Sequence, residues 1–265
     1  MGNDPTLKNL YSAVDQRQRG YTVNAITQRL RADYGIATGE GMVGTLELGD
    51  SIRTLNITAD TRLVDLGSGT AEPSRWIAGA TGCRVVAVDV SLDRVARVPI
   101  TSGADGICTD LNHGLPFRDS VFNACVQYDS IVHIADRDTY LDELRRIVEP
   151  GSALALTSST NGALAETERL ALGDVAGTIW RLTTPELEAV LERHGWTVTA
   201  IRSRRPEMLA FHGARRDALR AARTELVAEL PSGGFERLVS RAETVASLLE
   251  QHRLDMVFIT AICRA

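Results

Sequence analysis

The stretch at residues 63–91 constrains the fold more than any other part of this chain. A short apolar run at residues 63–66 stops at a glycine-rich turn, residues 67–70, and a helical pattern follows at about 73–80. A valine-rich run at residues 85–88 completes the order of strand, turn, helix and second strand. Because parallel neighbouring strands need such a crossover helix, the stretch predicts an α/β domain with a mostly parallel sheet.

The glycine turn and the acidic residue after the second strand predict a nucleotide-binding site. Gly67 and Gly69 allow a ligand to press on the backbone, and the start of the helix offers unpaired N–H groups. Asp89, at the tip of the second strand, is placed to accept hydrogen bonds from both hydroxyls of a ribose.

The residue three positions after Gly69 argues against a dinucleotide ligand. A dinucleotide fingerprint needs Gly or Ala there, so that the helix packs closely and its N-terminus stays free for pyrophosphate. This chain has Glu72, whose carboxylate would repel a pyrophosphate. A cationic or zwitterionic ligand therefore suits the site better than NAD.

These residues resemble motif I and the following acidic residue of the class I S-adenosylmethionine-dependent methyltransferases, whose pattern runs approximately D-x-G-x-G-T-G. The resemblance implies a Rossmann-like fold with a seven-stranded, mostly parallel sheet, and S-adenosyl-L-methionine as the cofactor. It places Asp65, Gly67 and Gly69 around the methionine part and Asp89 at the ribose. Ala71 stands where the family often has another glycine, which leaves less room beside the ligand.

Asp110 follows a short strand predicted near residues 106–108. By the same resemblance, its carboxylate would accept a hydrogen bond from the adenine amine, while the Leu111 backbone bonds a ring nitrogen. The alternative is structural, because aspartate suits turns and Asp110 would then cap the turn at residues 112–114.

The loop after the fourth predicted strand carries the catalytic candidates. In open α/β sheets, ligands lie beyond the carboxyl ends of the strands, which places residues 127–133 beside the reactive methyl. The sequence DSIVHIADR is similar to the loop of small-molecule methyltransferases, in some of which the equivalent histidine is the general base. His133 is therefore the candidate base, because imidazole accepts a proton near neutral pH. The equal alternative is that His133 only orients the loop. Tyr128 is the second catalytic candidate.

The predicted binding residues fall into two groups. The cofactor-binding candidates are Asp65, Gly67, Ser68, Gly69, Asp89, Val90, Asp110, Leu111 and Gln127. The substrate-binding candidates are Tyr11, Tyr21, Tyr128, His133 and Phe211. The aromatic members of the second group are able to stabilise a carbocation or enclose an ammonium group. The sequence predicts no bound metal ion.

Helical segments on both sides of the predicted sheet are expected to cover the cavity. Residues 1–56 are expected to form an N-terminal helical cap, and residues 57–265 the methyltransferase domain. A long helical insertion at about 206–252 exceeds ordinary connections, and such insertions are usually functional. For the N-terminal helices, a solvated cap without ligand contact is the equal alternative, since periodicity does not separate the two.

Several arginines gather in this insertion and just before it. They are Arg202, Arg204, Arg205, Arg215, Arg216, Arg220 and Arg223. Arginines clamp phosphate or carboxylate groups, so an anionic substrate such as a prenyl diphosphate is one alternative. Charged residues at helical spacing are more often a solvated face.

Composition narrows the partners and the setting. The net charge of −5 argues against a general nucleic-acid partner. No apolar run approaches the roughly 20 residues that span a bilayer, so no membrane association is expected. The four cysteines show no C-x-x-C pairing, which favours buried, reduced thiols and a cytoplasmic setting. A homodimer is compatible with this composition.

The residues and the resemblance predict methyl transfer from S-adenosylmethionine to a small molecule. The favoured acceptor is a hydroxyl or an amine of a metabolite or natural product. In-line methyl transfer depends mainly on holding donor and acceptor in near-attack geometry, which agrees with the lack of a serine or cysteine triad signature. The alternatives are C-methylation of a prenyl diphosphate, a cyclase or isomerase that keeps the cofactor for structure, and a non-catalytic binding module.

Overall fold

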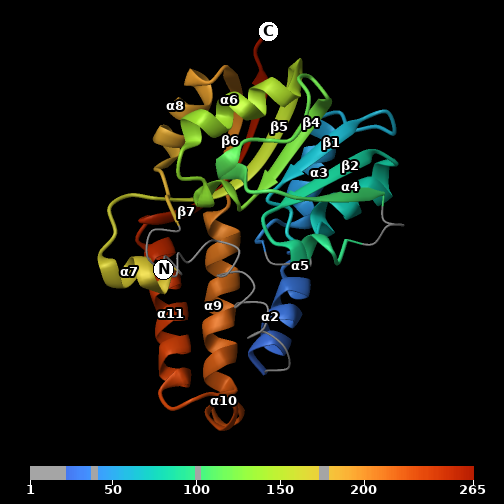
Figure 1. Cartoon of the computed structure of the whole chain (residues 1–265). Coiled ribbons are helices and arrows are strands. Elements are labelled where there is room, and N and C mark those ends of the chain that lie inside the picture. Colours follow the sequence, from blue (N-terminus) through green and yellow to red (C-terminus); the bar gives the residue numbers. More distant parts are fainter. Residues whose placement is uncertain (1–21, 37–40, 99–102, 173–178) are drawn as a thin grey trace, which may run out of the picture.

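The computed structural model describes residues 22–36, 41–98, 103–172 and 179–265 (Figure 1). A seven-stranded sheet with the strand order β3-β2-β1-β4-β5-β7-β6 forms its centre. The neighbours from β3 to β5 are parallel, and β7 runs antiparallel to both β5 and β6. The structure therefore confirms the predicted Rossmann-like, mostly parallel sheet. Tyr11 and Tyr21 lie outside the described residues.

The strand order fixes where a ligand can bind. The strands are β1 (Arg62–Leu66), β2 (Arg84–Asp89), β3 (Ala104–Cys108), β4 (Phe122–Tyr128), β5 (Val148–Asn161), β6 (Trp196–Ser203) and β7 (Leu254–Cys263). From β1 the chain proceeds outward to β2 and β3, and it then returns to β4 on the other side of β1. The order switches between β1 and β4, so the carboxyl ends of these two strands flank the crevice where such sheets bind ligands.

Helices cover both faces of the sheet, as continuous apolar strands require. On one face, α3 (Thr45–Thr54) and α4 (Glu72–Thr81) contribute Leu48 and Ile77 to a core with β1, β2 and β4. On the other face, α6 (Arg137–Ile147) and α8 (Thr184–Arg193) pack against the sheet through buried leucines and isoleucines. Three short elements, α5 (Leu92–Val95), η1 (Leu111–His113) and η2 (Ile131–His133), follow β2, β3 and β4 directly.

The helix α6 illustrates how the sequence specifies these layers. Asp136 caps its start, because the Asp136 side chain accepts a hydrogen bond from the Thr139 amide at 3.1 Å. Leu141, Leu144 and Ile147 recur at helical spacing and are fully buried, while the arginines of the last turn face outward. The cap and the apolar stripe together fix both the start and the buried face of the helix.

A second group of helices lies beyond one end of the sheet (Figure 1). It consists of α2 (Thr22–Asp33), α7 (Glu166–Ala171), α9 (Arg205–Ala221), α10 (Arg223–Glu229) and α11 (Gly234–Glu250), which we call the helical group. The long helices α9 and α11 pack side by side, and α2 packs on α9. A separate apolar core around Phe211, Leu219 and Phe235 holds the group together. No helix within the described ranges is long and apolar enough to cross a membrane.

The N-terminal helices divide between the two parts of the molecule. The helix α2 belongs to the helical group, whereas α3 packs on the sheet beside α4. A buried ion pair joins the parts, because Glu47 of α3 accepts from Arg204 at 3.1 Å and both side chains are almost fully buried. The division of the chain at residue 56 stays a prediction.

Candidate active site

The glycine turn after β1 is built by close backbone contacts. Gly67 has φ of +73°, and the amides of Gly67 and Ser68 both donate to the Val88 carbonyl at 2.8 Å. A Cβ atom at position 67 would overlap the Ser130 side chain, whose hydroxyl donates to the Leu66 carbonyl at 2.7 Å. The turn therefore holds the ends of β1, β2 and β4 together, and position 67 tolerates only glycine.

Replacement of Gly67 by Ala is expected to destabilise the protein by about 2–5 kcal/mol, the sum of left-handed backbone strain and overpacking. For a chain of this size, that lowers Tm by roughly 4–20 °C in a thermal melt. Gly79→Ala is the matched control, because Gly79 lies within α4 with open space around its Cα. Alanine in a helix interior should leave Tm unchanged or raise it. Equal melting of the Gly67→Ala variant and the wild type would contradict this account.

Asp89 ends β2 with both carboxylate oxygens oriented by the backbone. Oδ2 accepts from the Gly69 amide at 2.8 Å, and Oδ1 accepts from the Ser91 amide at 2.9 Å. The residue is only 5% exposed. Each oxygen keeps a further lone pair, so the fixed carboxylate is able to accept two hydroxyl hydrogen bonds from a ligand.

Asp65, near the end of β1, is a buried carboxylate with one oxygen that makes no hydrogen bond to the described residues. It is 1% exposed, and its Oδ2 has no hydrogen-bond partner among the described residues. The pKa of Asp65 is raised to about 7, mainly by burial. A hydrogen bond from the Ser74 hydroxyl lowers this pKa, and the negative charge of Asp89 raises it further. A buried carboxylate in this state favours a ligand with a positive group, which would pair with it and restore its ionised form.

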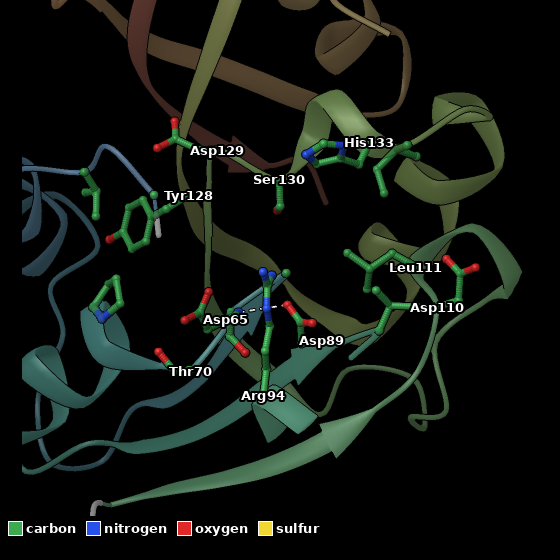
Figure 2. A pocket seen from close by; sticks show the side chains of 18 of the residues that line it. Asp65, Thr70, Asp89, Arg94, Asp110, Leu111, Tyr128, Asp129, Ser130 and His133 are labelled. Atoms are coloured by element: carbon green, nitrogen blue, oxygen red, sulfur yellow. Dashed lines mark hydrogen bonds between the residues drawn. The ribbon is translucent and has the colours of Figure 1, made fainter. Parts of the chain in front are cut away.

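These residues surround a cavity of about 250 Å³ at the carboxyl ends of the central strands (Figure 2). The predicted residues that line it are Asp65, Gly67, Ser68, Gly69, Asp89, Val90, Asp110, Leu111, Tyr128 and His133. The lining residues that were not named as binding candidates are Gly41, Val43, Thr70, Pro73, Arg94, Asn112, Asp129, Ser130 and Ile134, of which Thr70, Asp129 and Ser130 lie in the turn and the loop predicted at the site. The structure thus brings together most of the predicted cofactor site and adds a wall from residues 41–43.

Two predicted site residues lie elsewhere. Gln127 is fully buried and does not line the cavity, because side chains alternate along β4 and the adjacent Tyr128 is the one that faces it. Phe211 lies in the core of the helical group, with its ring edge-on to Tyr34 at 5.9 Å and only 2% exposed. The predictions of a cofactor contact for Gln127 and of a substrate contact for Phe211 therefore find no support in the position of either side chain.

The two catalytic candidates, Tyr128 and His133, both line the cavity but differ in burial and in hydrogen bonding. The Tyr128 hydroxyl donates to Ser51 Oγ at 2.8 Å, and burial raises the Tyr128 pKa well above its usual value. Tyr128 thus shapes the cavity but is a poor proton acceptor near neutral pH. His133 lies on η2, where its amide donates to the Ser130 carbonyl at 3.0 Å. Figure 2 shows its imidazole at the cavity, partly exposed.

Asp129 lies in the loop 127–133 that the sequence placed at the site, but it was not named as a candidate residue, and it connects three segments at the cavity. It has φ of +57°, and its Oδ1 accepts from the Thr157 hydroxyl of β5 at 2.8 Å. Its Oδ2 accepts from the Met42 amide at 2.5 Å. Asp129 therefore fastens the wall at residues 41–43 over the ends of β4 and β5. An aspartate directly after a buried strand, where a left-handed residue is needed, is the signal that could have found it.

Asp110 lines the cavity and also caps the following turn. Its Oδ1 accepts from the Asn112 amide at 2.9 Å, and its Oδ2 lies 3.0 Å from His113 Nδ1. Partial burial opposes ionisation, but the hydrogen bonds from Asn112 and His113 outweigh it and lower the pKa of Asp110. The structural alternative is thus present in the fold, while the hydrogen bond to an adenine amine stays a prediction.

Most of the predicted arginine clamp is neutralised by carboxylates. The pairs are Arg202 with Glu47 and Asp50, Arg204 with Glu47, Arg205 with Asp255, Arg216 with Asp217, Arg220 with Glu243 and Arg223 with Glu236. Apart from the Arg216–Asp217 pair, which lies within α9, these contacts tie helices to each other and to the sheet. Except for Arg215, the structure therefore provides no support for an anion clamp from this set.

Comparison with known proteins finds methyltransferases among the relatives of this chain. The profile described as a methyltransferase domain matches residues 64–156. Methyltransferase GfsG of Streptomyces halstedii is 32% identical over 108 residues, which cover 38% of this chain and only 39% of that protein. Demethylmenaquinone methyltransferase of Streptomyces avermitilis is 30% identical over 181 residues, which cover 57% of this chain and 74% of that protein.

A solved structure extends the likeness in fold to nearly the whole chain. Phosphoethanolamine N-methyltransferase 2 of Haemonchus contortus, in complex with S-adenosyl-L-methionine, aligns with a TM-score of 0.74. The alignment covers 95% of this chain and 60% of that one at 17% identity, so it speaks for the fold alone. With the domain match around the glycine turn and a 30% identical relative covered over most of its length, the chain belongs to the class I S-adenosylmethionine-dependent methyltransferases.

Proposed function

We propose that this protein binds S-adenosylmethionine and transfers its methyl group to a small-molecule acceptor. The observation that carries the proposal is the buried Asp65 carboxylate, which lacks a partner for Oδ2 within the described residues and lines the cavity beside the glycine turn. S-adenosylmethionine has a positive amino group and a positive sulfonium, whereas NAD presents a pyrophosphate. A second carboxylate, Asp89, lies in the same cavity and makes an anionic ligand still less favourable there.

The residues present fit the parts of this cofactor. Asp65 and the glycine turn would hold the methionine part, and the two oriented oxygens of Asp89 would accept from the ribose hydroxyls. Asp110 and Leu111 also line the cavity, and they would bind the adenine. When bound, S-adenosylmethionine supplies an electrophilic methyl group. The task of the chain is then to exclude water and to hold the acceptor in line with that methyl group.

The acceptor would lie near the ends of β4 and β5, where the wall at residues 41–43 meets Asp129 and His133. Asp129 accepts from both Met42 and Thr157, so the wall and the strand ends form one rigid border. A hydroxyl or an amine are the acceptor groups that we favour. The prenyl diphosphate alternative loses the support of Arg202, Arg204, Arg205, Arg216, Arg220 and Arg223, because each is paired with a carboxylate.

Replacement of His133 by Ala tests the general base. We expect unchanged affinity for S-adenosylmethionine by calorimetry and a kcat lower by about 10²–10⁴-fold, because the acceptor would keep its proton. The matched control is His194→Ala, since His194 bonds the surface residues Asp138 and Asp142. The control should keep full turnover. Unchanged turnover of the His133 variant at saturating substrate would assign His133 to orienting the loop.

The reaction itself is tested with S-adenosylmethionine that carries a deuterated methyl group and with panels of hydroxylated metabolites and amines. A product that gains the labelled methyl group, together with release of S-adenosylhomocysteine, supports the proposal. A product of unchanged mass with turnover intact would instead assign a cyclase or isomerase. Cofactor binding without turnover of any acceptor would favour a binding module.

A further inference from the structure

Three arginines and a histidine lie on the neighbouring helices α2, α9 and α11. They are Arg31 of α2, His212 and Arg215 of α9, and Arg241 of α11, which we call the cationic cluster. The helix α9 packs against both α2 and α11. Arg31 is only 7% exposed, while Arg241 adds its charge from the solvent side. Positive groups from three helices thus converge on one place.

The members of the cluster act on each other electrostatically. Burial first, and then the charges of Arg241 and Arg31, lower the pKa of Arg215. Burial, together with the charges of Arg215 and Arg241, lowers the pKa of His212 to about 3, so His212 is neutral at physiological pH. Like charges that lie close together raise the free energy of the folded chain, most of all where they are partly buried, unless an anion lies among them.

The described part of the chain supplies no such anion to Arg215 or Arg241. Neither guanidinium has a carboxylate within 4.0 Å among residues 22–36, 41–98, 103–172 and 179–265. The nearby Arg220 of the same helix contrasts with them, because it is paired with Glu243. In the same cluster, the enclosed Nδ1 of His212 has no hydrogen-bond partner within these ranges. Two cationic donors and a neutral imidazole therefore lie close together without an anion from any described residue, a combination that suits an oxyanion.

The position of the cluster relates it to the cavity. Arg31 Nη2 lies 3.8 Å from Met42 Sδ. Met42 stands between Gly41 and Val43, which both line the cavity, and its amide donates to Asp129. Through Arg31, the cluster thus adjoins the wall at residues 41–43 on the side of the helical group. An acceptor that enters beside this wall would present one end to the cavity and the other to the cluster.

We propose that the cationic cluster binds an oxyanion group, a phosphate or a carboxylate, on the methyl acceptor. This inference rests on the proposed methyl transfer and names the chemical class of its substrate. Asp65 and Asp89 of the cavity select the positive cofactor, while the arginines of the helical group select the negative acceptor. The opposite charges of the two sites would keep each ligand in its own place.

Thermal melts in buffer free of phosphate and carboxylate test the cluster. The probes are inorganic phosphate, pyrophosphate and acetate, on the wild type, Arg215→Gln, Arg215→Lys and the control Arg220→Gln. At about 100 times its dissociation constant, an effective probe should raise the Tm of the wild type and the control by roughly 5 °C. The same probe should leave Arg215→Gln unchanged and act partially on Arg215→Lys, which keeps the charge but not the planar fork. Without a probe, Arg215→Gln should melt no lower than the wild type.

The pattern of probes identifies the source of the oxyanion. Stabilisation by phosphate or pyrophosphate indicates a phosphorylated acceptor, and stabilisation by acetate alone indicates a carboxylate. The inference is overturned if no probe stabilises the wild type, or if Arg215→Gln responds as the wild type does. It is also overturned if Arg215→Gln without a probe melts well below the control, because the chain itself would then neutralise Arg215. Calorimetry with S-adenosylmethionine on the same proteins is the separate test of the proposed function, and all should bind it equally.

Discussion

Replacement of Asp65 by Asn is expected to stabilise the ligand-free protein and to remove most of its affinity for S-adenosylmethionine. The stability effect follows from the raised pKa of about 7, against an ordinary value of 3.8. Between these two values the folded state binds more protons than the unfolded state, so the free energy of unfolding falls as pH rises from about 4 to 7. At pH 8 the ionised carboxylate costs up to about 4 kcal/mol, which asparagine would avoid.

The same replacement that stabilises the ligand-free protein is expected to weaken the binding of S-adenosylmethionine. A charge-assisted hydrogen bond contributes about 1.5–3 kcal/mol, so the Asn variant should bind S-adenosylmethionine roughly 10–100-fold more weakly at pH 8. In the wild type the affinity should also fall as pH drops below 7, because the carboxylate must lose its proton to face a cation. The Asn variant should lack this dependence.

Melts and calorimetry at pH 6 and pH 8 measure both effects. Asp60→Asn is the matched control, because Asp60 is exposed and lies away from the cavity lining. The control should match the wild type in Tm and in affinity at both pH values. A Tm of Asp65→Asn below that of the wild type at pH 8 would show that Asp65 is satisfied in the free protein, and the argument for a cationic ligand would fail.

Replacement of Asp89 by Ala should produce the largest loss of cofactor affinity. The variant loses both ribose acceptors, and at about 1.5–3 kcal/mol for each the affinity should fall roughly 10²–10⁴-fold. It also leaves the Gly69 and Ser91 amides without their side-chain acceptor, so the glycine turn should loosen. Titration calorimetry gives the affinity, and a thermal melt in the absence of cofactor reports the state of the turn.

Asp89→Asn separates these two effects. Its side-chain oxygen still accepts from one backbone amide, so it should melt closer to the wild type than Asp89→Ala does. It should nonetheless bind the cofactor weakly, because its NH₂ group cannot accept from a ribose hydroxyl. Wild-type affinity in both variants would contradict the assignment of Asp89 to the ribose.

The sheet and the glycine turn were predictable because their signals are local. The run before Gly67, the turn and the run before Asp89 lie within one stretch, and each part has its own pattern of apolar residues or glycines. Ala71 shows the same point, because the structure gives it φ of +58°, a conformation that explains the glycine common there in the family.

The rest of the site depends on contacts between distant segments. The wall at residues 41–43 reaches the cavity through a hydrogen bond from Met42 to Asp129, 87 positions later in the chain. Gln127 and Tyr128 point to opposite faces of β4, and only Tyr128 lines the cavity. An error of one position in the predicted strand exchanges the residues that are assigned to the two faces. The local sequence around Phe211 did not indicate that its ring packs against Tyr34, which is far away in the chain.

The arginines show why composition did not reveal the anion site. Seven arginines gather in a short part of the sequence, but five of them pair with carboxylates from other segments, and Arg216 pairs with the adjacent Asp217. Arg215 differs from these six arginines because the charged groups that act on it, Arg31 and Arg241, are themselves positive and lie on other helices. Its environment is therefore a property of the folded chain and not of the local sequence.

The most direct test of the account is calorimetric titration of the wild-type protein with S-adenosylmethionine, S-adenosylhomocysteine and NAD. The charges and hydrogen-bond acceptors of the cavity predict micromolar binding of the two sulfur ligands, no binding of NAD, and loss of binding in Asp89→Ala. No binding of either sulfur ligand, or tighter binding of NAD, would contradict the assignment of the cavity and of the proposed reaction.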